Sequence, residues 1–360
     1  MAHRDLSKAK KGKDDEFYTQ LTDIEKECKH YKEHFKGKTI FCNCDDPYWS
    51  NFFYYFIAKF NDFGLKKLIS THYKDNGLPL FADIKPENPY KITVTKVSKD
   101  LLKLPVEAMV THIIAENGGR VPLKGDGDFR SNECIELLKE SDIVITNPPF
   151  SLFREFVDLI MDHNKKFLII GNTNAITYKN VFKYIKENRI WAGVSTFNQG
   201  LYFIVPDSLP CQKIENGKRL VRVSSVCWYT NLQHQRQNDS LILTERYSNE
   251  KFPKYDNYDA IEVSTWKAIP KDYKGVMGVP ITFLDKYNPS QFEIIGTSDN
   301  GIIDDKYKTT QGLRKKFVDD YYKAGGKGSY KEGNPTAGLY VNGVATMIYK
   351  RLFIKNRNPE

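Results

Sequence analysis

The residues that point most directly to chemistry are Asn147-Pro148-Pro149-Phe150, which follow the apolar stretch 142–146. Consecutive prolines have fixed φ angles and no amide hydrogens, so they make this turn rigid and leave its carbonyl groups free. The exocyclic amine of a base has two N–H donors, and the Asn147 side-chain oxygen and the Pro148 carbonyl can accept one each. Phe150 offers an aromatic face on which the base can stack, a contact worth about 1–3 kcal/mol.

An amine held in this way directs its lone pair at an incoming methyl group, so the turn is suited to direct methyl transfer. Such a displacement depends mainly on positioning and on the exclusion of water, and it requires neither a metal nor a strong general base. The alternative interpretation is an ordinary Pro-Pro turn that ends a strand, because short motifs also arise by chance.

Two further polar stretches occur where cofactors bind in α/β sheets, beyond the ends of strands. Cys44, Asp45 and Asp46 follow the first predicted strand, and the two carboxylates can bind a cationic ammonium group. Asp128 and Phe129 lie in a Gly/Asp-rich turn and can pair with and cover an adenine ring. Each stretch also has a structural explanation, as a helix cap in the first case and a simple turn in the second. The first strand lacks the Gly-x-Gly-x-x-Gly pattern of an NAD site.

Strands and helices alternate over residues 14–206, which predicts an α/β sheet with right-handed crossovers. Helices are expected where apolar residues recur at steps of three and four, and strands where short apolar runs end at turns. The predicted helices cover residues 20–36, 49–60, 131–140, 152–162 and 176–187. The predicted strands cover residues 39–43, 65–70, 142–146, 167–170, 190–194 and 201–205.

Three regions depart from this alternation. Residues 74–124 are punctuated by prolines and include an alternating stretch at 90–96, which predicts an insertion with an exposed strand and a small hairpin. Residues 207–360 are rich in polar loops, Tyr and Lys, with short strands such as 223–229, so we expect a second module there. Residues 1–13 are basic and lack apolar periodicity, which predicts a flexible arm.

The composition permits a nucleic-acid partner without requiring one. The 360 residues include 54 Lys and Arg against 45 Asp and Glu, a net charge of +9. The six cysteines form no C-x-x-C pair, which predicts free thiols in a reducing compartment and no zinc site. The N-terminus lacks a signal peptide, and no apolar run reaches the ~18–20 residues that cross a bilayer, so we expect a cytoplasmic protein.

Two basic clusters are candidates for contact with a DNA backbone. They are Lys10, Lys11 and Lys13 in the N-terminal arm, and Arg314, Lys315 and Lys316 in the second module. Contacts of this kind release counterions from DNA, so binding weakens as salt is added. The alternatives are a frayed terminus and a solvated, lysine-rich surface.

The order of these motifs is typical of one known family. The chain closely resembles the EcoRI modification methylases, which are adenine-specific type II DNA methyltransferases, from about residue 14 to 357. The resembling stretches of the first part are 15–20, 31–34, 42–47, 50–53, 125–131, 141–144, 146–153, 166–170 and 176–179. Those of the second part are 253–261 and 275–284.

The resemblance implies a Rossmann-like, S-adenosylmethionine-dependent methyltransferase sheet with an appended C-terminal target-recognition region. The catalytic domain would cover residues 14–206, with 74–124 as an insertion, and the DNA-binding region would cover 207–360. The implied reaction transfers methyl from S-adenosylmethionine to the 6-amino group of an adenine flipped out of duplex DNA, and it leaves S-adenosylhomocysteine. No metal is implied.

The resemblance also assigns roles to residues of the motifs described above. The methionine end of the cofactor would be covered by Phe17, Tyr18 and Thr19, and Cys44, Asp45 and Asp46 would lie beneath the cofactor. Its adenine would lie near Asp128 and Phe129. The target base would be held by Asn147, Pro148, Pro149 and Phe150, and Asn147 would also lie beside the cofactor.

The implied partner is double-stranded DNA, methylated by a monomer that modifies one strand at a time in the bacterial cytoplasm, in association with the nucleoid. The chain would be the modification half of a restriction-modification system, with an endonuclease encoded nearby but not stably bound. The same Asn-Pro-Pro-aromatic turn serves enzymes that act on a base amine of RNA or on a glutamine amide of a protein. Those two substrates are the alternatives.

Overall fold

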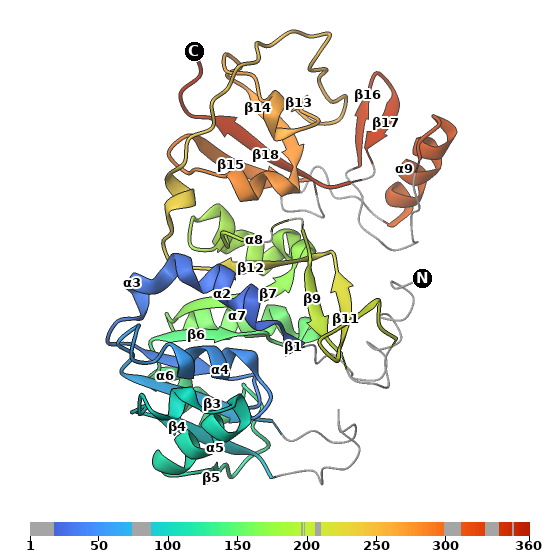
Figure 1. Ribbon diagram of the computed structural model, residues 1–360. Helices are drawn as coiled ribbons and strands as arrows, with labels where there is room; N and C mark the ends of the chain where they lie inside the picture. The colour runs from blue at the N-terminus through green and yellow to red at the C-terminus, as the bar shows by residue number, and fades with distance from the viewer. Residues whose placement is uncertain are drawn as a thin grey trace. The chain divides into compact units, whose positions relative to one another are not determined.

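The computed structural model describes residues 18–73, 88–195, 197, 199–205, 210–298, 311–327, 338–347 and 349–360. The chain forms two compact units (Figure 1). Unit 1 consists of the described residues up to 175 together with 190–233, and unit 2 consists of 176–189 together with the described residues from 234 to 360. No helix of the described residues is long and apolar enough to cross a membrane.

Unit 1 is built on an eight-stranded mixed sheet with the order β5-β4-β3-β2-β6-β7-β12-β8. Its strands are β2 (Thr39–Cys42), β3 (Lys67–His72), β4 (Tyr90–Val94), β5 (Val121–Pro122), β6 (Ile143–Thr146), β7 (Lys166–Asn172), β8 (Trp191–Ala192) and β12 (Val226–Thr230). The four central strands β3, β2, β6 and β7 are parallel, and the outer strands pair antiparallel. All residues of β2 and β6 are buried, as expected of parallel strands covered on both faces.

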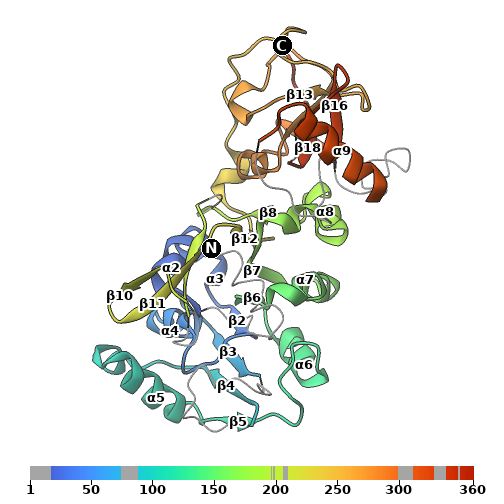
Figure 2. The same cartoon turned by 90° about the vertical axis from the view of Figure 1, so that its right-hand side faces the viewer.

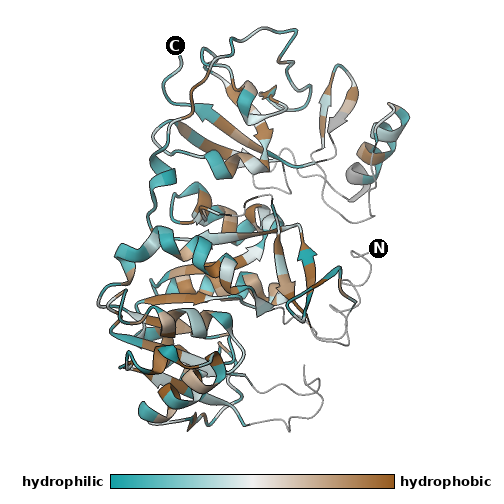
Figure 3. Cartoon of the chain, viewed as in Figure 1, coloured by the Kyte–Doolittle hydropathy of each residue, from teal (hydrophilic) through white to brown (hydrophobic). Residues whose placement is uncertain are grey.

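Helices cover both faces of this sheet. The helices of unit 1 are α2 (Leu21–Cys28), α3 (Lys32–Phe35), α4 (Asn51–Ala58), α5 (Val106–Glu116), α6 (Asn132–Glu140) and α7 (Phe153–Asp162), with the 3-10 turns η1 (Lys29–Tyr31), η2 (Leu101–Lys103), η3 (Phe150–Leu152) and η4 (Thr173–Thr177), the last of which runs into unit 2. Helices α2, α4 and α5 lie on one side and α6 and α7 on the other (Figure 2). The apolar central strands contrast with the hydrophilic outer surface of α2 and α3 (Figure 3).

A second, smaller sheet in unit 1 has the order β1-β9-β11-β10 and is antiparallel throughout. Its strands are β1 (Tyr18–Thr19), β9 (Leu201–Ile204), β10 (Lys213–Glu215) and β11 (Lys218–Val223). Strand β1 directly precedes α2 and pairs with β9, a strand about 180 residues away in sequence. Loop-closure entropy grows only slowly with loop length, so this large separation adds little to the cost of the pairing.

Unit 2 contains a four-stranded sheet with the order β13-β14-β18-β15 and a separate hairpin of β16 and β17. Its elements are β13 (Ile261–Glu262), β14 (Val276–Pro280), β15 (Phe292–Thr297), β16 (Leu339–Val341), β17 (Val344–Met347), β18 (Arg351–Asn356), α8 (Lys179–Lys186), α9 (Gln311–Lys323), η5 (Gln235–Asn238), η6 (Trp266–Ala268) and η7 (Ile281–Lys286). In its core the buried Arg351 donates to Glu262 over 2.9 Å, and the Tyr255 hydroxyl donates to the same carboxylate.

The expected α/β fold is confirmed, as are the predicted helices and strands of residues 20–70 and 131–205, and the structure adds that the large sheet is mixed. The segment 74–124 differs from the expected exposed hairpin. Its strand β4 lies in the central sheet with every second residue buried, and it contains α5, a helix that the sequence analysis missed. Strands β10 to β12 lie in unit 1 and α8 lies in unit 2, whereas the sequence analysis divided the chain after residue 206.

Candidate active site

Two candidate turns follow neighbouring strands: the Asp-rich turn (residues 44–46) follows β2, and the Pro-Pro turn (residues 147–150) follows β6. β2 and β6 pair in parallel, with Ile40 opposite Ile143, so their carboxyl ends meet at one edge of the sheet. The chain continues from β2 to β3 on one side and from β6 to β7 on the other. This reversal of strand order is where α/β sheets leave a crevice for ligands.

Asp45 connects the two turns directly. One oxygen of its buried carboxylate accepts from the Ser50 hydroxyl over 2.8 Å, and the other accepts from the Thr146 hydroxyl at the end of β6. Its backbone carbonyl accepts from the Ser70 hydroxyl over 2.6 Å. Burial and the neighbouring Asp45 raise the pKa of the Cys44 thiol, so this thiol stays protonated at neutral pH. Asp45 therefore fixes the turn between β2, β3 and β6.

Asp46 is the more accessible of the two aspartates. Its carboxylate lies 2.6 Å from His72 Nδ1, at the end of β3, and accepts from the Tyr48 backbone N–H over 2.8 Å. The Tyr90 hydroxyl donates to it over 3.4 Å, and the Tyr90 ring stacks on His72 with centroids 5.0 Å apart. The side chain of Asp46 retains 17% exposure, so it can contact a ligand at this edge of the sheet.

The turn at residues 125–129 packs against the end of β3. Gly127 has a φ of +80°, and a Cβ there would lie 2.5 Å from the His72 carbonyl oxygen and 3.1 Å from the Tyr73 Cα. Only glycine permits both this conformation and this close approach. The turn is thereby held beside the carboxyl end of β3.

Asp128 is partly exposed, whereas Phe129 is buried. Arg130 Nε and Nη2 each donate to Asp128 over 2.8 Å, and this pairing lowers the pKa of the carboxyl. Arg130 also donates to Glu155 of α7 over 2.9 Å. The Phe129 side chain is 5% exposed and packs edge-on against Phe156, with ring centroids 5.0 Å apart. Phe129 is thus part of the core that supports the turn.

The Pro-Pro turn itself lies against β9. Pro148 is buried, whereas Asn147, Pro149 and Phe150 are half-buried. The Asn147 side-chain oxygen is also buried. The Phe150 ring meets the Phe203 ring of β9 edge-on, with centroids 6.5 Å apart, so β9 contributes to the placement of Phe150.

Strand β1 brings the predicted N-terminal stretch to the same place. Thr19 pairs with Phe203, and its carbonyl accepts from the Asn51 side chain at the start of α4 over 2.7 Å. Thr19 is buried, and its hydroxyl makes no hydrogen bond within the part of the chain that the structure describes. A buried hydroxyl of this kind is expected to be satisfied by water or by a ligand. Tyr18 is half-buried in β1, and Phe17 lies outside the described residues.

The structure adds residues that the sequence analysis missed. Ser50 caps α4 by accepting from the N–H of Phe52, a role that its position before an apolar helix could have indicated. Asn51, His72 and Phe203 had no such signal, because their contacts are with residues remote in sequence.

The predicted basic residues lie apart from these turns in the sequence, and the structure describes them only in part. Lys10, Lys11, Lys13 and the side chain of Arg314 lie outside the described residues. Lys315 is exposed on α9, and Lys316 donates to Asp320 one turn later over 2.8 Å. No three His, Cys, Asp or Glu side chains of the described residues lie close enough together to hold a metal ion.

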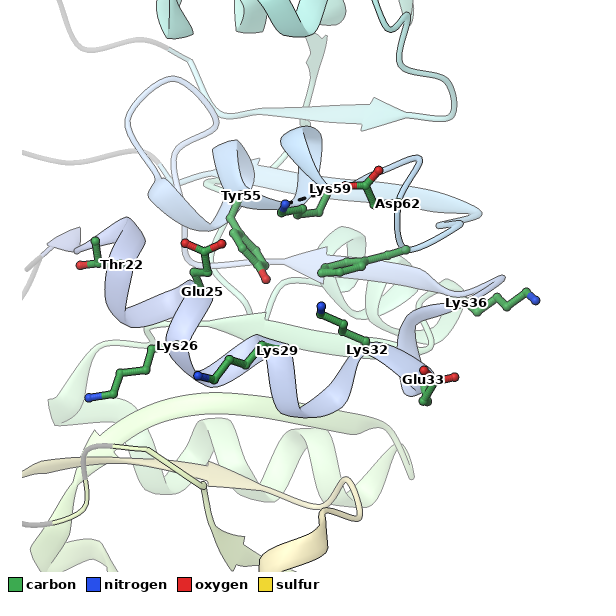
Figure 4. Close-up of a pocket in the computed structure, with 11 residues that line it drawn as sticks. Thr22, Glu25, Lys26, Lys29, Lys32, Glu33, Lys36, Tyr55, Lys59 and Asp62 are labelled. Carbon is green, nitrogen blue, oxygen red and sulfur yellow. Dashed lines mark ion pairs between the residues drawn. The ribbon is translucent and has the colours of Figure 1, made fainter.

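A groove of about 620 Å³ lies elsewhere in unit 1, between the helical segment α2–α3 and α4 (Figure 4). Lys26, Lys29, Lys32 and Lys36 line one side, and Lys59 lies opposite them. None of the predicted site residues lines this groove, so it is a feature separate from the two turns.

The comparisons with known proteins concern nearly the whole chain. The family described as "Adenine-specific methyltransferase EcoRI" matches residues 5–357. The chain is 48% identical to the type II methyltransferase M.EcoRI of Escherichia coli over 297 residues, which cover 81% of this chain and 88% of that protein.

Two mycoplasma proteins are also similar. The chain is 40% identical to the type II methyltransferase M.MpnI of Mycoplasma pneumoniae, over 81% of this chain and 84% of that protein. It is 39% identical to the type II methyltransferase M.MgeORF184P of Mycoplasma genitalium, over 81% of this chain and 85% of that protein. No solved structure matches the chain.

Proposed function

The chain belongs to the family of the adenine-specific EcoRI methyltransferase and is a type II DNA methyltransferase, and from this premise we propose that Asn147-Pro148-Pro149-Phe150 holds a flipped adenine. The reaction is methyl transfer from S-adenosylmethionine to the 6-amino group of that adenine in duplex DNA. The observation that carries the proposal is the rigid turn at the end of β6, beside the turn that follows β2. Of the substrates weighed from the sequence, the family favours DNA over an RNA amine or a glutamine amide.

In this mechanism the turn positions the amine. The Asn147 side-chain oxygen and the Pro148 carbonyl accept its two hydrogens and direct its lone pair toward the methyl donor. The base stacks on Phe150, whose ring is supported from the side by Phe203. Exclusion of water and alignment of the reacting atoms supply most of the acceleration, so no side chain has to act as a strong base.

The polar groups around the turns suit the cofactor. S-Adenosylmethionine supplies a methyl group on a sulfonium centre, next to an ammonium and a carboxylate. The Thr19 hydroxyl, buried and with no hydrogen bond among the described residues, is suited to the methionine end, and the accessible carboxylate of Asp46 to the ammonium. Asp128 would contact the adenosine, since the Gly127 backbone holds it beside β3. Cys44 and Asp45 would support this surface from below.

The remaining features complete the proposal. Residues 14–206, together with strands β10 to β12 that lie in unit 1, would form a Rossmann-like catalytic part, and the rest of 207–360 a target-recognition region, with Lys315 and Lys316 near the DNA backbone. The protein would act on double-stranded DNA as a monomer and without a metal, in the bacterial cytoplasm. A cognate endonuclease would act separately on the same sequence.

Asn147→Ala tests the proposal. Loss of one preorganised hydrogen-bonding group is expected to slow methyl transfer by about 10²–10³-fold or more. The measurement is transfer of labelled methyl to unmethylated genomic DNA, combined with sequencing that maps methyladenine, and S-adenosylhomocysteine affinity is measured by calorimetry. Asn132→Ala, an exposed asparagine of α6, is the matched control. Wild-type turnover by the Asn147 variant would refute the assignment, as would methyl transfer to RNA or protein alone by the native chain.

A further inference from the structure

Glu27 of α2 is a buried carboxylate that the proposed mechanism does not use. It is 0% exposed, and it accepts four hydrogen bonds. The donors are the Val194 backbone N–H over 2.8 Å, the Ser195 backbone N–H over 2.6 Å, the Ser195 hydroxyl, and the Tyr31 hydroxyl over 2.9 Å. All these donors are uncharged, so several hydrogen bonds together compensate the desolvation of one carboxylate.

The backbone around residue 193 lies directly on this carboxylate. A Cβ at Gly193 would overlap Glu27 Oε1 and would lie 2.5 Å from the Trp228 Cβ. Burial raises the pKa of Glu27, and the four donors oppose that shift. The direct hydrogen bonds from residues 194 and 195 and the close approach of Gly193 together set the position of this backbone.

The segments that Glu27 joins both lead to the candidate active site. Its helix α2 begins just after β1, which carries Thr19. Residues 193–195 follow β8 and precede β9, which carries Phe203. Because β1 and β9 also pair with each other, the two segments are fastened at two places: the strand pairing and the Glu27 carboxylate. Phe203 in turn contacts Phe150 of the Pro-Pro turn.

We infer that Glu27 is a positioning residue for methyl transfer, which fixes the β1–β9 pair, and with it Thr19 and Phe203, against the turn that holds the base. The inference rests on the proposed function for its consequence. The fastening itself rests on the hydrogen bonds between residues 168 positions apart. Glu27 touches neither the cofactor nor the base, and it acts through the two strands.

Glu27→Gln keeps the shape of the side chain but turns one acceptor into an N–H₂ donor that faces another donor. We expect S-adenosylhomocysteine to bind about tenfold more weakly and methyl transfer in a single turnover to slow by about tenfold or more, the effect of one lost hydrogen bond to a charged group. Amide hydrogen exchange in β9 is expected to accelerate by a similar factor, because the strand opens more often. All measurements are made well below the unfolding temperature.

Two milder variants separate positioning from general stability. Ser195→Ala removes a hydrogen bond that joins the two segments and is expected to shift S-adenosylhomocysteine affinity in the same direction. Tyr31→Phe removes a hydrogen bond to the same carboxylate from its own helical segment, so it is expected to leave that affinity unchanged.

The outcomes are distinct. A lowered unfolding temperature with wild-type S-adenosylhomocysteine affinity, β9 exchange and single-turnover rate in Glu27→Gln would overturn the inference, as would equal losses in the serine and tyrosine variants. Failure of the proposed function would appear instead as absence of DNA methylation by the native chain. Hydrogen exchange in β9 reports on Glu27 in either case.

Discussion

Both units of the molecule hold carboxylates that are buried or nearly buried, but they satisfy them differently. In unit 1, Glu27 receives two backbone N–H groups and two hydroxyls, and Asp45 receives the hydroxyls of Ser50 and Thr146. In unit 2, Glu262 is paired with a buried arginine and one tyrosine hydroxyl. In unit 1 the cost of removing each carboxylate from water is offset by several neutral donors, whereas in unit 2 it is offset mainly by one cation.

This difference has consequences for sensitivity to substitution. A buried ion pair that loses its cation leaves an uncompensated charge, which is far more costly than loss of one neutral donor among several. The neutral donors of unit 1 come from segments that meet around the candidate active site, so their removal is expected to disturb positioning more than folding. The pair in unit 2 joins β13 to β18, and its removal is expected to affect folding first.

The largest effect on stability is expected for Arg351→Met. The variant leaves the nearly buried Glu262 without its cation and should lower the free energy of unfolding by about 3–5 kcal/mol. Urea denaturation provides the measurement. The double variant Arg351→Met/Glu262→Leu should be more stable than the single one, because it carries no unpaired charge. Equal stabilities of the single and double variants would contradict the comparison.

A smaller effect is expected for Thr146→Val. The substitution removes one of the hydroxyls that Asp45 accepts from, and it should cost about 1–2 kcal/mol, with a measurable loss of S-adenosylhomocysteine affinity. Thr111→Val is the matched control, because the Thr111 hydroxyl donates to a backbone carbonyl at an exposed position. If Thr146→Val were as costly as Arg351→Met, the distinction between neutral donors and a buried cation would fail.

The smallest effect is expected for the ion pair of Arg130 and Asp128, which is partly exposed to solvent and so tests an ion pair that water screens. Arg130 depresses the pKa of Asp128 in the folded state, so the pair stabilises the protein above the unfolded pKa of about 3.9 and loses this contribution as the pH falls through the folded value. Because solvent screens the pair, Arg130→Gln should cost only about 0.5–1 kcal/mol at pH 7 and almost nothing near pH 2. Unfolding free energies from pH 2 to 7 test this, and a pH-independent cost would exclude the linkage.

The part of the fold that depends on local pattern could be predicted from the sequence. The apolar residues 143–145 and the prolines that follow predict a buried strand that ends in a turn, and both are present. The segment 74–124 could not be predicted in the same way. Its helix α5 is apolar on much of its surface and its strand β4 reads as exposed, and only packing against the central sheet reveals which residues are buried.

The candidate site shows the same division. The sequence indicated the turns that carry Asp45 and Asn147, because their residue types and their places after apolar strands are local properties. It assigned Phe129 to a ligand surface, a role that remains a prediction, while the structure finds this ring packed on Phe156. Aromatic residues look alike in sequence whether they face a ligand or the core, and burial alone distinguishes them.

The sequence by itself thus determined the family, the alternation of strands and helices, and the turn that carries the proposed chemistry. The tertiary structure alone decided that Glu27 meets Ser195, 168 residues away, and that Asp45 meets Thr146, 101 residues away. The physical reason is that burial removes water as a competitor, so a buried polar side chain depends on the particular partner that the fold places beside it. That happens when strands distant in sequence are brought together around one core.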